Sequence, residues 1–274
     1  MITVEIRHLH HHADHWFVRG LEARLRGARL VQQDGDAVVF PWPGDDLDPV
    51  IAALREGKHV LVEANAIGWS TPLHRLIDAV TPSRIFALIN SDRYLPSRQL
   101  IRQQLDAGKI GRPGLIRVYH PRVGDISTRM LSALDQILWY FGELPTVAFA
   151  HRIGREHDQI HLGFEGGGMA MATFAGFSVH SSLSLIGSSG AAYADEQMNK
   201  QVLNQGGSPR LVQMGDTGTQ WAGVVQYFVD AIAEKRDLSS SIDSWRQVMV
   251  LSEAIERSIA LGQAVELEGG PFHG

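Results

Sequence analysis

The chain has 274 residues, of which 44% are hydrophobic and 20% charged, and its formal net charge is -5. This length suffices for a sizeable core and for two domains. Lysine and arginine are scattered along a net negative chain, so the composition excludes the basic footprint that binds nucleic acid or anionic membranes. We therefore expect small-molecule or protein partners, with no nucleic acid and no membrane among them.

The sequence has no cysteine, which excludes disulfides, thiolate metal sites and thiol nucleophiles. That composition fits a reducing compartment. No apolar run reaches the length of about eighteen residues that spans a bilayer. The N-terminal stretch MITVEIRHLHHH lacks the apolar core and the small-residue cleavage site of a signal peptide. We expect a cytoplasmic protein.

The N-terminal segment has the order strand, loop, helix with which a Rossmann domain begins. Residues Ile2 to Ile6 alternate and are rich in β-branched side chains, and Asp14 can cap a helix. Several histidines fill the loop and the start of the helix: His8, His10, His11, His12 and His15. Imidazole is a common metal ligand. However, no carboxylate motif accompanies the cluster and adjacent histidines cannot all face one centre, so we expect polar loop residues and no metal site.

The next segment is too short for a complete nucleotide-binding domain. Arg29 to Gln32 is a short strand, and Asp34 with Gly35 predicts a hairpin turn into the strand Ala37 to Phe40. Only about ten residues separate the first helix from the strand Ala37 to Phe40, whereas the connection of a βαβ crossover alone takes at least about ten to twelve. At least one βα unit is therefore missing. Asp34 is either the acid for an adenosine ribose or a turn residue.

The stretch EGKHVLVEAN, Glu56 to Asn65, organises the first half of the chain. It follows a predicted helix over 45–55 and contains a turn at Gly57 and a continuous apolar strand, which is typical of a parallel strand covered on both faces. Ligands of open α/β sheets lie beyond the carboxyl ends of such strands. Glu63 and Asn65 are therefore candidates for a ligand crevice, as is Trp42 after the preceding strand.

The remaining chain alternates helix and strand and then becomes a sheet. Helices are predicted over 72–80, 98–106 and 128–142, with strands over 85–90 and 115–119. From residue 146 to 192 the apolar period is two, which indicates an antiparallel sheet. The final helices, over 220–234 and 244–261, carry apolar stripes that indicate packing.

Four motifs, GKHVLVE, RY-x-P, AGKIGRPG and LDQILWYFG, together resemble the glucose-fructose oxidoreductase and inositol dehydrogenase family, Gfo/Idh/MocA. The resemblance implies a truncated Rossmann-like domain over residues 1–108. It also implies an α/β domain over 109–274 with a large, open, mainly antiparallel sheet, and with the helix near 128–142 or the C-terminal helices packing back on the first domain. The outer sheet face commonly builds an oligomer in this family, so we expect a homo-oligomer, most simply a dimer.

The same resemblance implies that the usual chemistry is missing. Where the family has a lysine beside the nicotinamide and an acid/base histidine, this chain has Ala64 and Ser132. Arg7, Leu9 and His12 stand where the fingerprint glycines belong, and side chains of this size obstruct the approach of a pyrophosphate. An arginine or a protonated histidine there could still hold an anion. We expect no cofactor, or NAD or NADP bound weakly, and a noncatalytic protein that binds a ligand or a partner.

The predicted ligand-binding residues are Trp42, Glu63, Asn65, Arg93, Tyr94, His120 and Asp135. A structural role for Asp135 stays open. Two other functions also stay open. One is an enzyme with changed chemistry, with Glu63, Asp135, His120 or His15 as its proton-transfer groups. The other is an NAD(P)-dependent oxidoreductase that acts on a sugar-like substrate.

Overall fold

The computed structural model describes residues 1–7, 14–43, 46–67, 73–121, 126–154, 157–175, 181–195, 200–204, 210–213 and 217–271. Contacts within the chain divide it into two compact units. The first comprises Met1–Leu95 and Asp216–Trp245, and the second comprises Pro96–Gly215 and Arg246–Gly274. The boundary expected between residues 108 and 109 stays a prediction about where separately folding domains meet.

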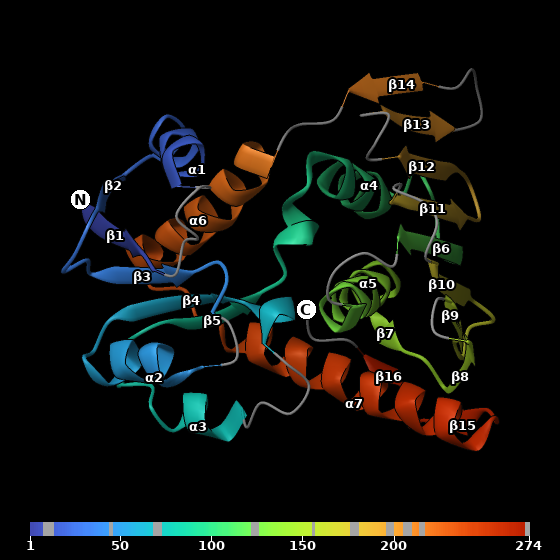
Figure 1. Ribbon diagram of the computed structural model, residues 1–274. Helices are drawn as coiled ribbons and strands as arrows, with labels where there is room; N and C mark the ends of the chain where they lie inside the picture. Colours follow the sequence, from blue (N-terminus) through green and yellow to red (C-terminus); the bar gives the residue numbers. More distant parts are fainter. Residues whose placement is uncertain are drawn as a thin grey trace. The chain divides into compact units, whose positions relative to one another are not determined.

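The first unit is a parallel sheet covered by helices (Figure 1). Its elements are β1 (Ile2–Ile6), α1 (Asp14–Glu22), β2 (Ala28–Val31), β3 (Ala37–Phe40), α2 (Asp48–Arg55), β4 (His59–Glu63), η1 (Ala64–Ala66), α3 (Leu73–Ile77), β5 (Phe86–Ile89), η2 (Ser91–Tyr94) and α6 (Thr217–Glu234). The five strands have the order β2-β1-β3-β4-β5, and every neighbouring pair is parallel. A Rossmann sheet has the order 3-2-1-4-5-6. Among the residues that the structure describes, the strand outside β2 is the one that is lacking.

Both faces of this sheet are buried, as the continuous apolar runs predict. All residues of β3 and β4 are buried. Leu21 of α1 and Phe228 of α6 belong to one apolar cluster with Leu61 of β4, so α1 and α6 cover one face. Figure 1 shows α2 on the other face, where it packs on β4. Gly57 ends this helix with a left-handed φ of 72°, which a side chain would strain.

The predicted hairpin at Asp34 and Gly35 is wrong. β2 and β3 lie on opposite sides of β1 and run parallel to it. Their registers explain how a short link suffices. Val31, the last residue of β2, is level with Glu5, and Ala37, the first of β3, is level with Val4. The link 32–36 therefore moves sideways by two strand spacings, about 10 Å, within a reach of about 17 Å.

Gly35 lies against the backbone of β1 where the link crosses it. A Cβ at Gly35 would lie 2.8 Å from the amide nitrogen of Glu5 and 2.9 Å from the carbonyl oxygen of Ala37. Next to it, the Asp36 carboxylate accepts hydrogen bonds from Thr3, at 3.0 Å from its amide nitrogen and 2.6 Å from its hydroxyl. Asp34 has a φ of 58° and is exposed, which is the geometry of a turn residue.

The second unit is built on a large sheet. Its elements are α4 (Pro96–Asp106), β6 (Pro113–Pro121), α5 (Ile126–Phe141), β7 (Glu143–Leu144), β8 (Val147–Ile153), β9 (His157–Gly163), β10 (Met169–Ala175), β11 (Ser182–Gly187), β12 (Ala191–Asp195), β13 (Lys200–Asn204), β14 (Arg210–Gln213), β15 (Val265–Glu266) and β16 (Gly270–Pro271), and α7 (Ser239–Leu261) ends in it. The nine strands of the sheet have the order β14-β13-β12-β11-β6-β10-β9-β8-β15. Among the described residues, β6 and β10 form the one parallel pair of this sheet, so the expected mainly antiparallel sheet is confirmed.

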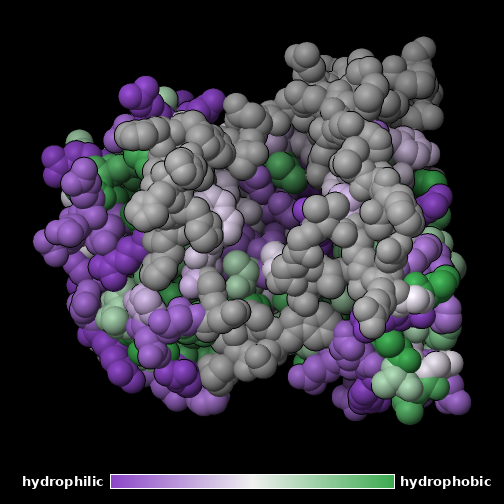
Figure 2. Space-filling view, viewed as in Figure 1, coloured by the Kyte–Doolittle hydropathy of each residue, from purple (hydrophilic) through white to green (hydrophobic). Residues whose placement is uncertain are grey.

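The large sheet has one buried face and one exposed face. Along β9 and β10 every second residue is buried, and α5 packs on β6 and β10. Figure 2 shows hydrophobic residues, in green, at the surface near its right-hand edge, which is where β9 and β10 lie in Figure 1. Apolar side chains on the outer face include Met169 and Ile186, which are 55% and 40% exposed. Within the described part of the chain, no helix is long and apolar enough to cross a membrane.

Candidate functional site

The carboxyl edge of the parallel sheet places polar residues after β4 and β5, as the sequence predicts. Glu63 is the last residue of β4 and is only 4% exposed. Its two carboxylate oxygens accept the backbone N–H of Ser91, which follows β5, at 3.1 and 3.2 Å. A buried carboxylate needs such donors, because an isolated buried charge is costly. Glu63 therefore joins the ends of two neighbouring strands.

Further polar contacts extend from this pair. The side-chain nitrogen of Asn65 lies 3.4 Å from the side-chain oxygen of Asn90, which also accepts the N–H of Asp92 at 3.1 Å. From α6, the amide nitrogen of Gln220 donates to the Ser91 hydroxyl at 3.2 Å and to the Asp92 carboxylate at 3.1 Å. We call this set, Glu63, Asn65, Asn90, Ser91, Asp92 and Gln220, the polar shelf.

An aromatic pair adjoins the polar shelf. Trp42, after β3, is 36% exposed, and its ring centroid lies 6.1 Å from that of Trp221, with 51° between the ring planes. Trp221 follows Gln220 in α6, so consecutive residues of this helix contact the shelf and the indole of Trp42. This edge of the sheet therefore combines a partly exposed indole with amides and carboxylates. That composition is typical of a site for hydroxylated ligands.

Arg93 and Tyr94 lie on η2 at the same edge. The backbone N–H of Arg93 donates to the carbonyl of Asn90 at 3.2 Å. The ring of Tyr94 packs on α6, with its centroid 5.8 Å from that of Tyr227. A Cβ at Gly223 would lie 3.3 Å from the Tyr94 ring, so the glycine permits this packing. Burial raises the pKa of the Tyr94 hydroxyl, followed by a smaller effect of Tyr227. Ligand contact by either residue stays a prediction.

Of the three residues expected at the fingerprint-glycine positions, the structure describes Arg7. Arg7, expected at the first glycine position, pairs with Glu5 through Nε and Oε1 at 2.6 Å and through Nη2 and Oε2 at 3.3 Å. This hydrogen bond raises the pKa of the Arg7 guanidinium. The anion-binding role left open for Arg7 would have to displace the Glu5 carboxylate. After β2 the link crosses β1 sideways, and Asp34, the candidate acid for a ribose, is an exposed turn residue in it. Leu9 and His12 lie outside the described residues.

His120 and Asp135 belong to the second unit. His120 is on β6 and 6% exposed, its Nδ1 lies 2.9 Å from the Ser181 hydroxyl, and its ring stacks on Phe174 with 5.9 Å between centroids. Asp135 is on α5 and 2% exposed. Both are buried polar residues of their own unit, and their part in a ligand site stays a prediction.

Ser132, at the position of the acid/base histidine, lies in a closed hydrogen-bonded group. The side-chain nitrogen of Gln136 donates to its hydroxyl at 3.2 Å and to its carbonyl at 3.3 Å. Arg98 in turn donates through Nε to the Gln136 side-chain oxygen at 2.7 Å. All three residues are at most 2% exposed. The group therefore contributes to the packing of α4 on α5.

A metal centre is not indicated by the described residues, none of which form a group of three or more metal-ligating side chains. His8, His10, His11 and His12 lie outside the described residues, and so does the side chain of His15. The expectation that this cluster binds no metal therefore stays a prediction.

Solved structures with the same fold as this chain are known. The aldose-aldose oxidoreductase from Caulobacter crescentus, complexed with glycerol, is similar to 97% of this chain over 99% of its own, with a TM-score of 0.81 and 16% identity. The fold is that of the Gfo/Idh/MocA oxidoreductases. The myo-inositol 2-dehydrogenase from Lactobacillus plantarum shares this Gfo/Idh/MocA fold with a TM-score of 0.74, 17% identity and coverage of 97% and 99%.

A third Gfo/Idh/MocA structure holds both a cofactor and a ligand. It is the scyllo-inositol dehydrogenase from Lactobacillus casei with bound NAD(H) and scyllo-inositol, with a TM-score of 0.70, 18% identity and coverage of 97% and 99%. No family model matches the chain, and no curated protein matches its sequence. At these identities the comparisons establish the fold.

Sequence reasoning missed three residues at the carboxyl edge. Gln220 and Trp221 come from a helix that begins more than a hundred positions after β5, and their apolar neighbours indicate only a packing stripe. Asn90 was read as the end of a strand. One signal was available for it: like Glu63, it is a polar residue that directly follows a buried strand.

Proposed function

We propose that this protein binds a neutral polyhydroxylated small molecule, a sugar or a polyol, at the carboxyl edge of its parallel sheet, without transferring hydride to a nicotinamide. The observation that carries the proposal is the partly exposed indole of Trp42 at the same strand edge as the polar shelf. Sugars and polyols present C–H faces that pack on an aromatic ring and hydroxyls that need both donors and acceptors. Asn65 and Asp92, both partly exposed, supply these.

The molecules bound in the similar structures support the ligand class. One similar protein was crystallised with glycerol and another with scyllo-inositol. A levoglucosan dehydrogenase of the same fold, with a TM-score of 0.71 and 16% identity, was crystallised with NADH and L-sorbose. These statements concern those proteins, and we extend the ligand class, not the chemistry, to this chain.

The absence of hydride transfer is proposed from two buried positions. Ala64, where the resemblance implies a lysine, is 1% exposed and has no proton to exchange. Ser132, where the resemblance implies the acid/base histidine, accepts a hydrogen bond from Gln136, and a serine hydroxyl is a poor base near neutral pH. Neither residue can receive the proton of a hydroxyl that is being oxidised.

Calorimetric titration with myo-inositol, glucose and glycerol tests the proposal. We expect saturable binding of at least one, with Trp42→Ala weakening it about tenfold, or about 1.4 kcal/mol. Tyr193→Ala, which removes an exposed ring of the second unit, is the matched control. NAD and NADP should bind weakly or not at all. Saturation by either dinucleotide at micromolar concentration would support the oxidoreductase alternative instead, and undiminished sugar binding by Trp42→Ala would move the site elsewhere.

A further inference from the structure

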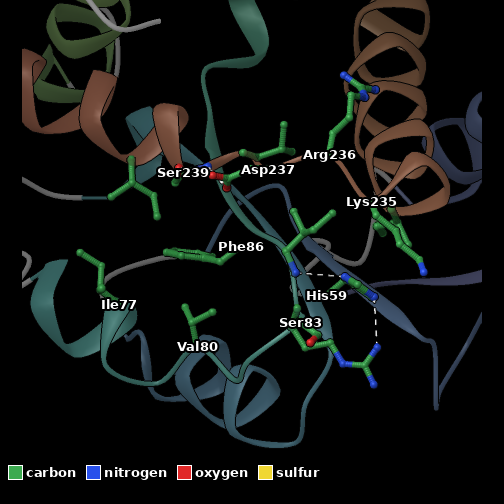
Figure 3. Close-up of a pocket in the computed structure, with 14 residues that line it drawn as sticks. His59, Ile77, Val80, Ser83, Phe86, Lys235, Arg236, Asp237 and Ser239 are labelled. Atoms are coloured by element: carbon green, nitrogen blue, oxygen red, sulfur yellow. Dashed lines mark hydrogen bonds between the residues drawn. The ribbon is translucent and has the colours of Figure 1, made fainter.

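The first unit contains a cavity of about 670 Å³ at the opposite, amino edge of its sheet. It surrounds the start of β5, the strand that ends the sheet order, between the last residues of α3, the end of α6 and the first turn of α7. In Figure 3, Phe86 lies in the middle of the view, with Ile77 and Val80 on one side of it and Asp237 and Ser239 on the other. The volume is in the range of small-molecule sites.

Most of the cavity wall is apolar. Seven of the lining residues are aliphatic or aromatic: Ile77, Val80, Ile85, Phe86, Ile232, Leu238 and Ile242. The edge of β5 is closed by α7, since the N–H of Leu88 donates to the Ser241 hydroxyl at 3.2 Å.

The polar end of the cavity is formed by His59, the first residue of β4, which is 9% exposed. The backbone N–H of Ile85 lies 3.1 Å from its Nδ1 and can only donate, so Nδ1 accepts. Burial, and next the charge of Arg84, lower the pKa of His59, which favours the neutral ring. In a neutral ring whose Nδ1 accepts, the hydrogen is on Nε2.

Nε2 then faces another donor. The Nη1 of Arg84 lies 3.2 Å from Nε2, and a guanidinium has no acceptor. With Nδ1 accepting, the Nε2 of His59 and the Nη1 of Arg84 are two donors 3.2 Å apart on the cavity lining, and neither can accept from the other. An oxyanion placed beside both would accept one hydrogen bond from each, and bonds of this charge-assisted kind are the strong ones.

The other charges around the cavity agree with an anion. Its lining includes three cationic side chains, those of Arg84, Lys235 and Arg236, and one carboxylate, that of Asp237. Asp237 is occupied by the N–H and hydroxyl of Ser239 at 2.9 and 2.8 Å. Arg236 is also occupied, since it pairs with Glu234 at 2.7 Å and lies over the ring of Tyr227. The other two cationic lining residues are Arg84 and Lys235.

We propose that this cavity is a second ligand site, which binds a small carboxylate with an apolar body. The carboxylate accepts from Nε2 of His59 and from the guanidinium of Arg84, and the apolar body packs on Phe86, Ile77 and Val80. A phosphate fits less well, because most of the wall would leave its charged oxygens without donors. The site is separate from the carboxyl edge and does not depend on the function proposed there.

Titration with 3-phenylpropionate tests the site, with 3-phenylpropanol as the neutral analogue and acetate as the headgroup without the apolar body. We expect 3-phenylpropionate to bind at least about tenfold, or about 1.4 kcal/mol, more tightly than either. Arg84→Met should weaken its binding by a similar factor. The control is Arg75→Met, which removes the same charge from an exposed residue of α3 that pairs with Asp48 outside the cavity.

A second variant keeps the test independent of Arg84. In His59→Asn, the side-chain oxygen can still accept the Ile85 N–H while the Nε2 donor is lost, so binding of 3-phenylpropionate should also weaken. Equal affinity for the acid and the alcohol would overturn the proposal. So would full affinity in Arg84→Met and His59→Asn, or the lack of saturation by 3-phenylpropionate in the unmodified protein.

Discussion

The two edges of the parallel sheet differ in how their buried polar groups find hydrogen-bond partners. At the carboxyl edge, donors meet acceptors: the N–H of Ser91 faces the carboxylate of Glu63, and Gln220 faces Asp92. At the amino edge, Nε2 of His59 faces the guanidinium of Arg84, and both groups donate. The comparison shows two outcomes for buried polar groups. They can form hydrogen bonds with one another, or they can leave donors whose acceptor a ligand would supply. The first edge should matter for stability without ligand, and the second for response to ligand.

The largest expected effect is at the carboxyl edge. Glu63→Ala removes the acceptor of the Ser91 N–H in a buried position, and should lower the free energy of unfolding by about 2–3 kcal/mol. Urea denaturation measures this loss. Glu63→Gln, which retains one oxygen acceptor, is the control and should lose less. Equal losses in both variants would show that the hydrogen bond is not what the carboxylate contributes.

The oligomeric state bears on the comparison of the two edges. A second subunit that covered either edge would supply hydrogen-bonding groups of its own there. We propose a homodimer through the outer face of the large sheet. Met169 and Ile186 are both in register with Leu115 of β6, so these apolar side chains form one row across β10, β6 and β11. Apolar patches of this kind are typical of interfaces.

Light scattering should give twice the chain mass for the unmodified protein and a monomer for Ile186→Lys. The same change at Val250 of α7, which is 54% exposed, should leave the dimer intact. A monomeric unmodified protein at micromolar concentration would remove the dimer proposal.

A smaller effect is expected from pH at the amino edge. Because the pKa of His59 is lowered below 6.5 in the folded protein, protonation favours unfolding. Its contribution to stability is complete above 6.5 and is lost as the pH falls through the window between 6.5 and the lowered value. Unfolding should therefore depend less on pH in His59→Asn, when urea midpoints are compared across this window. His151→Asn, at an exposed position of β8, controls for the loss of a histidine. An identical pH dependence in His59→Asn and the unmodified protein would contradict the assignment.

The smallest expected effect is on turnover with NAD or NADP, where we expect no change from zero. Restoring the two family positions in Ala64→Lys with Ser132→His should yield no turnover of sugars or polyols with NAD or NADP. The Arg7–Glu5 pair remains, and a histidine at position 132 would have to break the contacts of Gln136. The absorbance of reduced nicotinamide measures this, with the unmodified protein as the inactive reference. Turnover by either protein would argue against the noncatalytic proposal.

The sequence predicted the parallel strands well because their signal is local. Continuous apolar runs such as Ala37–Phe40 and His59–Glu63 read as buried strands regardless of their neighbours. The link after β2 could not be predicted in this way. A turn pair such as Asp34 with Gly35 fits a hairpin, and only the stagger of β2 and β3 along β1 distinguishes a sideways crossing.

The candidate site was predicted where it follows a strand and missed where it does not. Glu63 ends a buried strand, and Asn65 and Trp42 each lie two residues beyond one, which are positions that the ligand rule for open sheets covers. Gln220 reaches the same edge from α6 through packing that no local pattern records. The amino-edge cavity was missed for a similar reason: the role of His59 depends on which nitrogen Ile85 contacts, and that is a property of the pairing of β4 with β5.

The sideways link over β1 also decides how this chain can be lengthened or shortened. Removing a residue from 32–36 takes about 3.5 Å from its reach, so only about two can be lost before β2 and β3 can no longer flank β1. Added residues cost little, since doubling a loop costs about 0.6 kcal/mol. β2 ends the order of strands in this sheet. A complete βα unit inserted after Val31 could therefore pair on its outer side, and the Gfo/Idh/MocA architecture could regain its missing strand without any other strand changing neighbours.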